Sequence, residues 1–136
     1  MTRKGPTKTV DTAYGQGRLA TARDYLDAAR REVEGNKALG GNPAISLMVH
    51  AAIAFTDAVT ATHKGQVNQQ DHANAVNVLR DALGSRLPKD QVNKLTRILA
   101  EKDAAEYSPR RLSMDEARKL LVHLESYADW AESMTI

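Results

Sequence analysis

The chain has 136 residues, a common size for one domain with its own hydrophobic core. Apolar residues make up 42% of it but aromatic residues only 4%, a balance that favours closely packed helices over a sheet. It contains no cysteine, which excludes disulfides and thiol chemistry and is consistent with a reducing, cytoplasmic location.

The formal net charge of +2 is unevenly distributed, because Arg3, Lys4 and Lys8 precede the first acidic residue, Asp11. The remaining 16 Lys and Arg residues face 17 Asp and Glu residues, so the rest of the chain is nearly neutral. A nearly neutral domain has no general electrostatic attraction for nucleic acid. We expect residues 1–10, which lack the apolar segment of a signal peptide, to form a flexible basic arm before a single domain over residues 11–136.

Apolar residues at three- and four-residue spacings predict a first helix over about residues 11–39, ended by Gly40 and Gly41. Asn42 then opens a second helix to about residue 64, as its cap. Because this helix is apolar around most of its circumference, we expect it to be the central one. Its most apolar stretch, 44–59, is short for a bilayer and contains polar residues, so we expect a soluble protein without a membrane span.

Three further helices are predicted from the same periodicity, over about residues 69–83, 88–105 and 113–133. Asn68 is the expected cap of the first of these, and Ser113 with Glu116 forms the sequence of a capping box on the last. No alternating strand pattern is present, and the connections are short. The sequence therefore predicts an all-α antiparallel bundle of about five helices.

Candidate sites are few. No two histidines have the spacing of a helical metal site, and no phosphate-binding loop or dinucleotide motif is present, so we predict no metal and no cofactor. His50 stands alone on the apolar second helix, where we expect a structural or hydrogen-bonded role in the core.

A polar patch is predicted around the end of the fourth helix, where a tyrosine is followed closely by two arginines. Its members are Lys102, Glu106, Tyr107, Arg110 and Arg111. A tyrosine can stack a base while arginines hold phosphate. In the alternative interpretation, Tyr107 packs against the end of the bundle and the two arginines are only solvated.

Four segments, in order along the chain, resemble the HEPN domains, small helical bundles associated with nucleotide and RNA chemistry. They are residues 44–54, Gly65 followed by Asp71-His72, Ala105-Glu106-Tyr107, and residues 125–131. The resemblance covers roughly residues 44–131 and is strongest to the branch with an acidic-Tyr motif after the fourth helix. It implies a HEPN-like bundle that pairs as a homodimer at that end. It also implies RNA or a nucleotide as ligand, and a toxin–antitoxin or defence setting with a nucleotidyltransferase-like partner.

Ribonuclease members of that family use an Arg followed by a His after four to six residues, a pattern that Arg118 and His123 match. Residues five apart on a regular helix point roughly 140° apart, so the two do not converge unaided. Where the related branch carries Arg, this chain has Lys102, which lacks a planar two-pronged grip on phosphate. We therefore favour a non-catalytic binding module. The alternatives are a metal-independent ribonuclease toxin using Arg118 and His123, and a purely structural adaptor.

Overall fold

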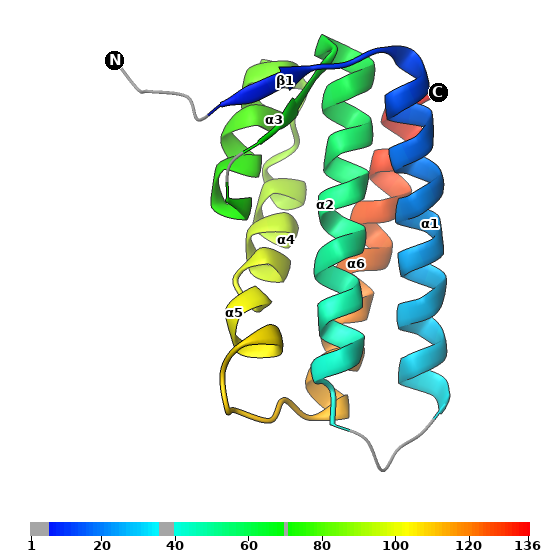
Figure 1. Ribbon diagram of the computed structural model, residues 1–136, viewed down its shortest axis with the longest axis vertical. Coiled ribbons are helices and arrows are strands. Elements are labelled where there is room, and N and C mark those ends of the chain that lie inside the picture. Colours follow the sequence, from blue (N-terminus) through cyan, green and yellow to red (C-terminus); the bar gives the residue numbers. More distant parts are fainter. Residues whose placement is uncertain (1–5, 36–39, 70) are drawn as a thin grey trace.

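The computed structural model describes residues 6–35, 40–69 and 71–136 of the chain. Four longer helices form the body of the molecule: α1 (Thr12–Gly35), α2 (Asn42–Lys64), α4 (Lys89–Leu99) and α6 (Met114–Met134). The shorter elements are β1 (Thr7–Thr9), β2 (Gln66–Asn68), η1 (His72–Asn74), α3 (Ala75–Leu83), η2 (Gly84–Arg86) and α5 (Lys102–Glu106). Figure 1 shows α1 and α4 running down the bundle and α2 and α6 running up it, which confirms the predicted all-α antiparallel bundle.

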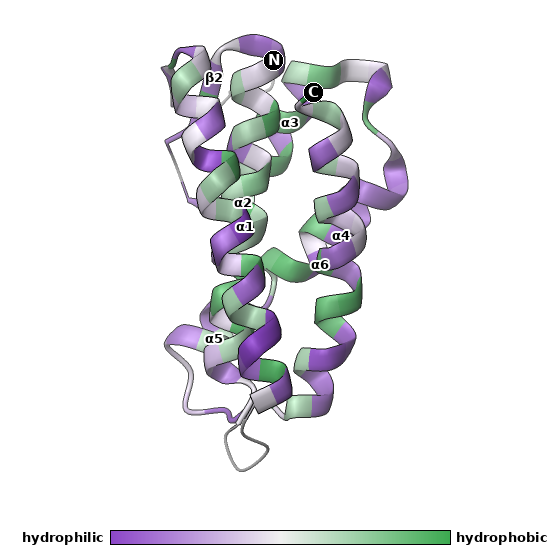
Figure 2. Ribbon diagram, turned by 90° about the vertical axis from the view of Figure 1, so that its right-hand side faces the viewer, coloured by the Kyte–Doolittle hydropathy of each residue, from purple (hydrophilic) through white to green (hydrophobic). Residues whose placement is uncertain are grey.

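The α2 helix is the centre of the bundle, as its apolar circumference predicts. Helices α1, α3, α4, α5 and α6 all contact it. Its fully buried side chains include Ile45, Met48, Val49, Phe55 and Val59. Figure 2 shows mostly hydrophobic positions along α2, whereas α1 and α6 each have a hydrophilic side as well.

The length argument against a membrane span is wrong, because α2 extends beyond the apolar stretch 44–59 to 23 residues. By length and composition this helix is able to cross a membrane. However, 78% of its most apolar 18-residue window is buried inside the bundle. Such burial is the pattern of a core helix.

Two of the predicted helix caps are wrong and one is confirmed. Gly41, which has no side chain, is the N-cap of α2, and the Asn42 side chain bonds the loop before α6 instead of the amides of its own helix. Asp71, not Asn68, caps the turn before α3, with its carboxylate accepting from the Ala73 amide at 3.1 Å. The capping box of α6 is present: the Ser113 hydroxyl accepts from the Glu116 amide at 3.0 Å, and the Glu116 carboxylate accepts from the Ser113 amide at 2.7 Å.

Part of the expected N-terminal arm is a strand. Residues 7–9 form β1, which pairs antiparallel with β2, while residues 1–5 lie outside the described residues. The α2 helix ends at Gly65, whose left-handed φ of 65° turns the chain, and the Val10 amide then donates to the Gly65 carbonyl at 2.8 Å. Strands of three residues are too short to show an alternating pattern.

The ends of two other predicted helices differ. The fourth divides into α4 and α5, separated by a turn at Ala100 and Glu101. The α1 helix extends as far as Gly35, and the predicted continuation over residues 36–39 lies outside the described residues.

Candidate functional site

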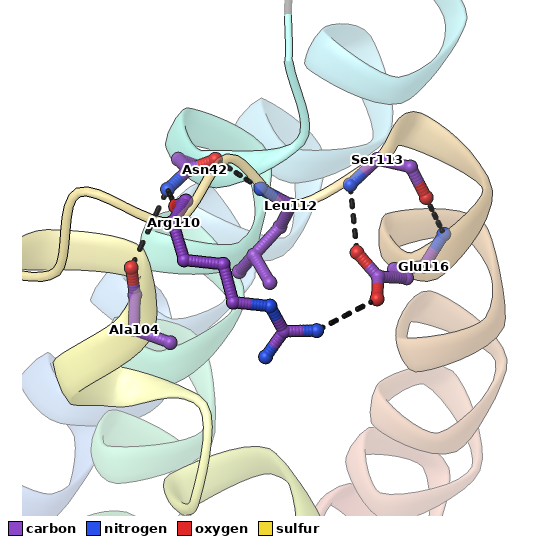
Figure 3. Close-up of polar contacts among 6 residues, drawn as sticks. All are labelled: Asn42, Ala104, Arg110, Leu112, Ser113 and Glu116. Atoms are coloured by element: carbon purple, nitrogen blue, oxygen red, sulfur yellow. Dashed lines mark hydrogen bonds and ion pairs between the residues drawn. The ribbon is translucent and has the colours of Figure 1, made fainter.

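The loop between α5 and α6 is fixed to the start of α2 by one side chain, that of Asn42 (Figure 3). The Asn42 amide nitrogen donates to the Arg110 carbonyl at 3.0 Å and to the Ala104 carbonyl at 3.4 Å. Its oxygen accepts from the Leu112 amide at 2.8 Å, and the Gly41 amide donates to the Leu112 carbonyl at 2.7 Å. Leu112 is buried beneath the loop. The loop is therefore held in one conformation over its second half.

Tyr107 lies at the start of this loop and is 74% exposed, so the predicted alternative that it packs against the bundle is wrong. It follows α5 directly, and the Lys102 ammonium lies 5.5 Å from the centre of its ring. That distance is within the range of a cation–π interaction. A large aromatic surface and a cation are thus presented together to solvent. Figure 1 places α5 at the opposite end of the bundle from β1.

The two arginines of the predicted patch differ in their partners. Arg110 points toward the first turn of α6 (Figure 3), where its guanidinium pairs with the Glu116 carboxylate at 3.0 Å. The Arg111 guanidinium lies beside Gly40, where an added Cβ would be 3.1 Å from its Nη2 atom. Both side chains are exposed, and Arg111 pairs with no carboxylate within the described ranges.

The Glu106 side chain lies against α2 and is largely buried. Its carboxylate accepts from the Ser46 hydroxyl at 3.0 Å and lies 3.3 Å from the His50 Nε2 atom. Its side chain is only 15% exposed, whereas the His50 side chain is 43% exposed. The predicted patch is therefore divided, because Glu106 is joined to α2 whereas Tyr107, Arg110 and Arg111 are exposed.

His50 is half-exposed and so lies outside the core, but its contact with Glu106 agrees with the structural or hydrogen-bonded role predicted for it. Its ring stacks on Tyr25 of α1, with the ring centres 5.3 Å apart. His72 lies within electrostatic reach of it: burial lowers the pKa of His72, the charges of Lys102 and His50 lower it further, and Glu106 opposes them. The spacing of Ser46 and His50, four residues apart, was the sequence signal that these two share one helix face.

No group of three or more His, Asp or Glu side chains is placed to hold a metal ion among residues 6–35, 40–69 and 71–136. The arrangement of Ser46, His50 and Glu106 is also unlike a nucleophilic triad, because Ser46 bonds the carboxylate and not the imidazole. What the geometry offers is an exposed stacking surface, Tyr107, with the Lys102 cation beside it.

The Arg118 and His123 side chains contact different neighbours. The Arg118 guanidinium bonds Asp115, one turn earlier on α6, at 2.6 Å. His123 instead lines a hollow against α4, beside Lys94 and Arg97. Burial lowers the pKa of His123, and the two neighbouring cations lower it further.

No protein-family model matches the chain, and no curated protein matches it.

Proposed function

We propose that this chain is a non-catalytic binding module of the HEPN type that engages RNA or a nucleotide at the α5 end of the bundle. The observation that carries the proposal is the exposure of Tyr107, at 74%, beside a loop that Asn42 fixes. Leaving an aromatic ring in water forgoes the stabilisation that burial gives. A base stacked on Tyr107 recovers it, and the fixed loop reduces the entropy cost of binding.

The charges around Tyr107 suit the phosphates of such a ligand. Lys102 already lies near the ring, and Arg111 has an exposed guanidinium without a carboxylate partner in the described part of the chain. Arg110 is available through exchange of its exposed ion pair with Glu116, which costs little. Contacts of this kind supply affinity without base specificity.

The absence of catalysis is part of the proposal. A metal-independent ribonuclease needs an acid–base group and a phosphate-stabilising group at one place. Arg118 bonds Asp115, and His123 lies against α4.

The remaining parts rest on the resemblance to HEPN domains. We propose that the module pairs as a homodimer in the cytoplasm and acts in a toxin–antitoxin or defence setting, with a nucleotidyltransferase-like protein as its partner. A purely structural adaptor would bind that partner and no nucleic acid.

The test is fluorescence anisotropy with a labelled single-stranded RNA oligonucleotide. Tyr107→Ala is expected to weaken binding about tenfold, because base–aromatic stacking contributes about 1–3 kcal/mol. Tyr107→Phe keeps the stacking surface and is expected to bind like the wild type. Tyr14→Ala is the matched control, because Tyr14 also has a lysine, Lys8, 5.2 Å from its ring centre but lies at the start of α1. Equal affinity for Tyr107→Ala and the wild type would refute the proposal.

A further inference from the structure

A hollow of about 380 Å³ lies between α4 and α6, and Tyr107 is not among its lining residues. Its lining residues are Asp90, Asn93, Lys94, Arg97 and His123. A second hollow, of about 210 Å³, adjoins it, because Arg97 lines both. Lys119 and Glu101 are among the residues around the second hollow. Arg97 therefore stands where the two meet.

The cations of this surface are only partly neutralised. The Lys94 ammonium lies 3.6 Å from the Asp90 carboxylate and donates to the Ser126 hydroxyl at 2.8 Å, which holds it beside the hollow. Arg97 is exposed and makes no ion pair or side-chain hydrogen bond within the described residues, and the same holds for Lys119. The N–H groups of the Arg97 guanidinium are therefore available to bind an anion in the hollow.

The pKa of His123 depends on the charges that surround the hollow. The charged groups that line the hollow with His123 come from α4 and are Asp90, Lys94 and Arg97, while Lys119, one turn earlier on α6, lines the second hollow. Burial lowers the pKa of His123, and Arg97 and Lys94 lower it further. The two cations therefore dominate over Asp90 at the imidazole, and a bound anion would reverse their effect.

We propose that the hollow between α4 and α6 binds a phosphate group, held by the Arg97 guanidinium, the Lys94 ammonium and an N–H of the His123 imidazole. Arginine matches two phosphate oxygens at once, while lysine adds a point charge. The ligand chemistry is a phosphate monoester or diester, either a free anion or part of a nucleic-acid backbone. This site stands independently of Tyr107.

The test is an NMR titration of the histidine side chains of the full chain, with and without inorganic phosphate at constant ionic strength. Phosphate is expected to bind saturably and to raise the pKa of His123. Arg97→Ala is expected to weaken phosphate binding about tenfold, because hydrogen bonds to charged groups are worth about 1.5–3 kcal/mol. Arg31→Ala, which removes an exposed arginine of α1, is the matched control and is expected to bind normally. An unchanged His123 pKa in phosphate would overturn the proposal, as would equal losses in the two variants.

Two further measurements are needed. The first identifies whether the phosphate is a free anion or part of a nucleic acid, and the second distinguishes this site from the one around Tyr107. Displacement of phosphate by single-stranded RNA would assign the hollow to a nucleic-acid backbone, and lack of competition would assign it to a free anion; either result supports the phosphate site. Tyr107→Ala is expected to retain phosphate binding, because Tyr107 is not among the residues that line the hollow. A failure of RNA binding at Tyr107 thus leaves this inference standing, and the reverse also holds.

Discussion

At the scale of single residues, Asp57 is the least expected feature of α2. It lies on the most buried part of the central helix, with its side chain 12% exposed and one oxygen 3.2 Å from the Arg18 Nε atom. Burial raises the pKa of Asp57 to about 6, although Arg18 opposes this shift. The folded state therefore binds a proton there more readily than the unfolded chain does.

This shift predicts a specific pH dependence of stability. Between about pH 4 and 6 the folded state holds more protons at Asp57 than the unfolded chain, so the contribution of Asp57 to the free energy of unfolding rises as the pH falls. We expect a contribution of about 2 kcal/mol, gained between pH 7 and pH 4. Chemical denaturation of the wild type and of Asp57→Asn over this range measures it.

The comparison of the two proteins isolates Asp57. His72 and His123 have lowered pKa values, so they destabilise the fold as the pH falls, but they are present in both proteins and cancel. If the difference between the two unfolding free energies were independent of pH, the assignment to Asp57 would be wrong.

Asn42 carries the second prediction at this scale. Asn42→Ala removes the acceptor of the Leu112 amide and the donor of the Arg110 carbonyl, so we expect a loss of about 2 kcal/mol in the free energy of unfolding. RNA affinity is expected to fall with it, because the loop after Tyr107 loosens. Asn77→Ala, at an exposed position of α3, is the control and is expected to change stability by less than about 0.5 kcal/mol. Similar losses in both variants would contradict the role given to Asn42.

The sequence indicated that Asn42 was structurally important but not how. Asn followed by Pro is typical of a helix start, where the side chain bonds the helix's own amides. Here Gly41 occupies the cap position, and the Asn42 side chain bonds backbone groups from 62 to 70 residues away. Only the folded arrangement of α2 and α5 reveals these partners.

At the scale of elements, the start of α6 was predictable because its signal is local. Ser113 and Glu116 satisfy two amides reciprocally within four residues. The strand pair and the break between α4 and α5 were not predictable in this way. β1 needs β2, almost 60 residues later, and the break at Ala100 and Glu101 lies among residues that all favour helix.

The capping box gives a prediction for α6. Ser113→Ala leaves the Glu116 amide without its acceptor, so we expect a loss of about 1 kcal/mol in the free energy of unfolding. Ser113→Asp retains an acceptor near a helix N-terminus and is expected to match the wild type. Thermal unfolding followed by circular dichroism measures both variants. Equal destabilisation by Ala and Asp would show that the hydroxyl, and not capping, matters at this position.

At the scale of the whole molecule, the fold was predictable and the grouping of site residues only partly so. Apolar periodicity indicated the central helix and the bundle. Four members of the predicted patch lie close together in the sequence, so we expected them at the same end of the bundle. They are Lys102, Tyr107, Arg110 and Arg111. Glu106 belongs to the same segment, but its partners Ser46 and His50 are about 60 residues away. The helical periodicity of the sequence did not show that the Glu106 side chain packs against α2.

Association is the prediction at this scale. We expect a homodimer with two-fold symmetry, as the resemblance to HEPN domains implies and as is commonest among small oligomers. Multi-angle light scattering at micromolar concentration is expected to give twice the mass of one chain. A monomer mass under these conditions would contradict the dimer and would also remove the arrangement that a two-chain ribonuclease site needs.

The central claim is that the α5 end of the bundle, around Tyr107, binds RNA or a nucleotide. The most direct measurement is backbone NMR of the ¹⁵N-labelled chain during titration with a single-stranded RNA oligonucleotide. The account predicts that the amides of Lys102, Tyr107 and Arg111 shift together and saturate, while those of β1 and the first turn of α1, at the opposite end, stay unchanged. Shifts confined to the opposite end, or no shifts at all, would contradict it.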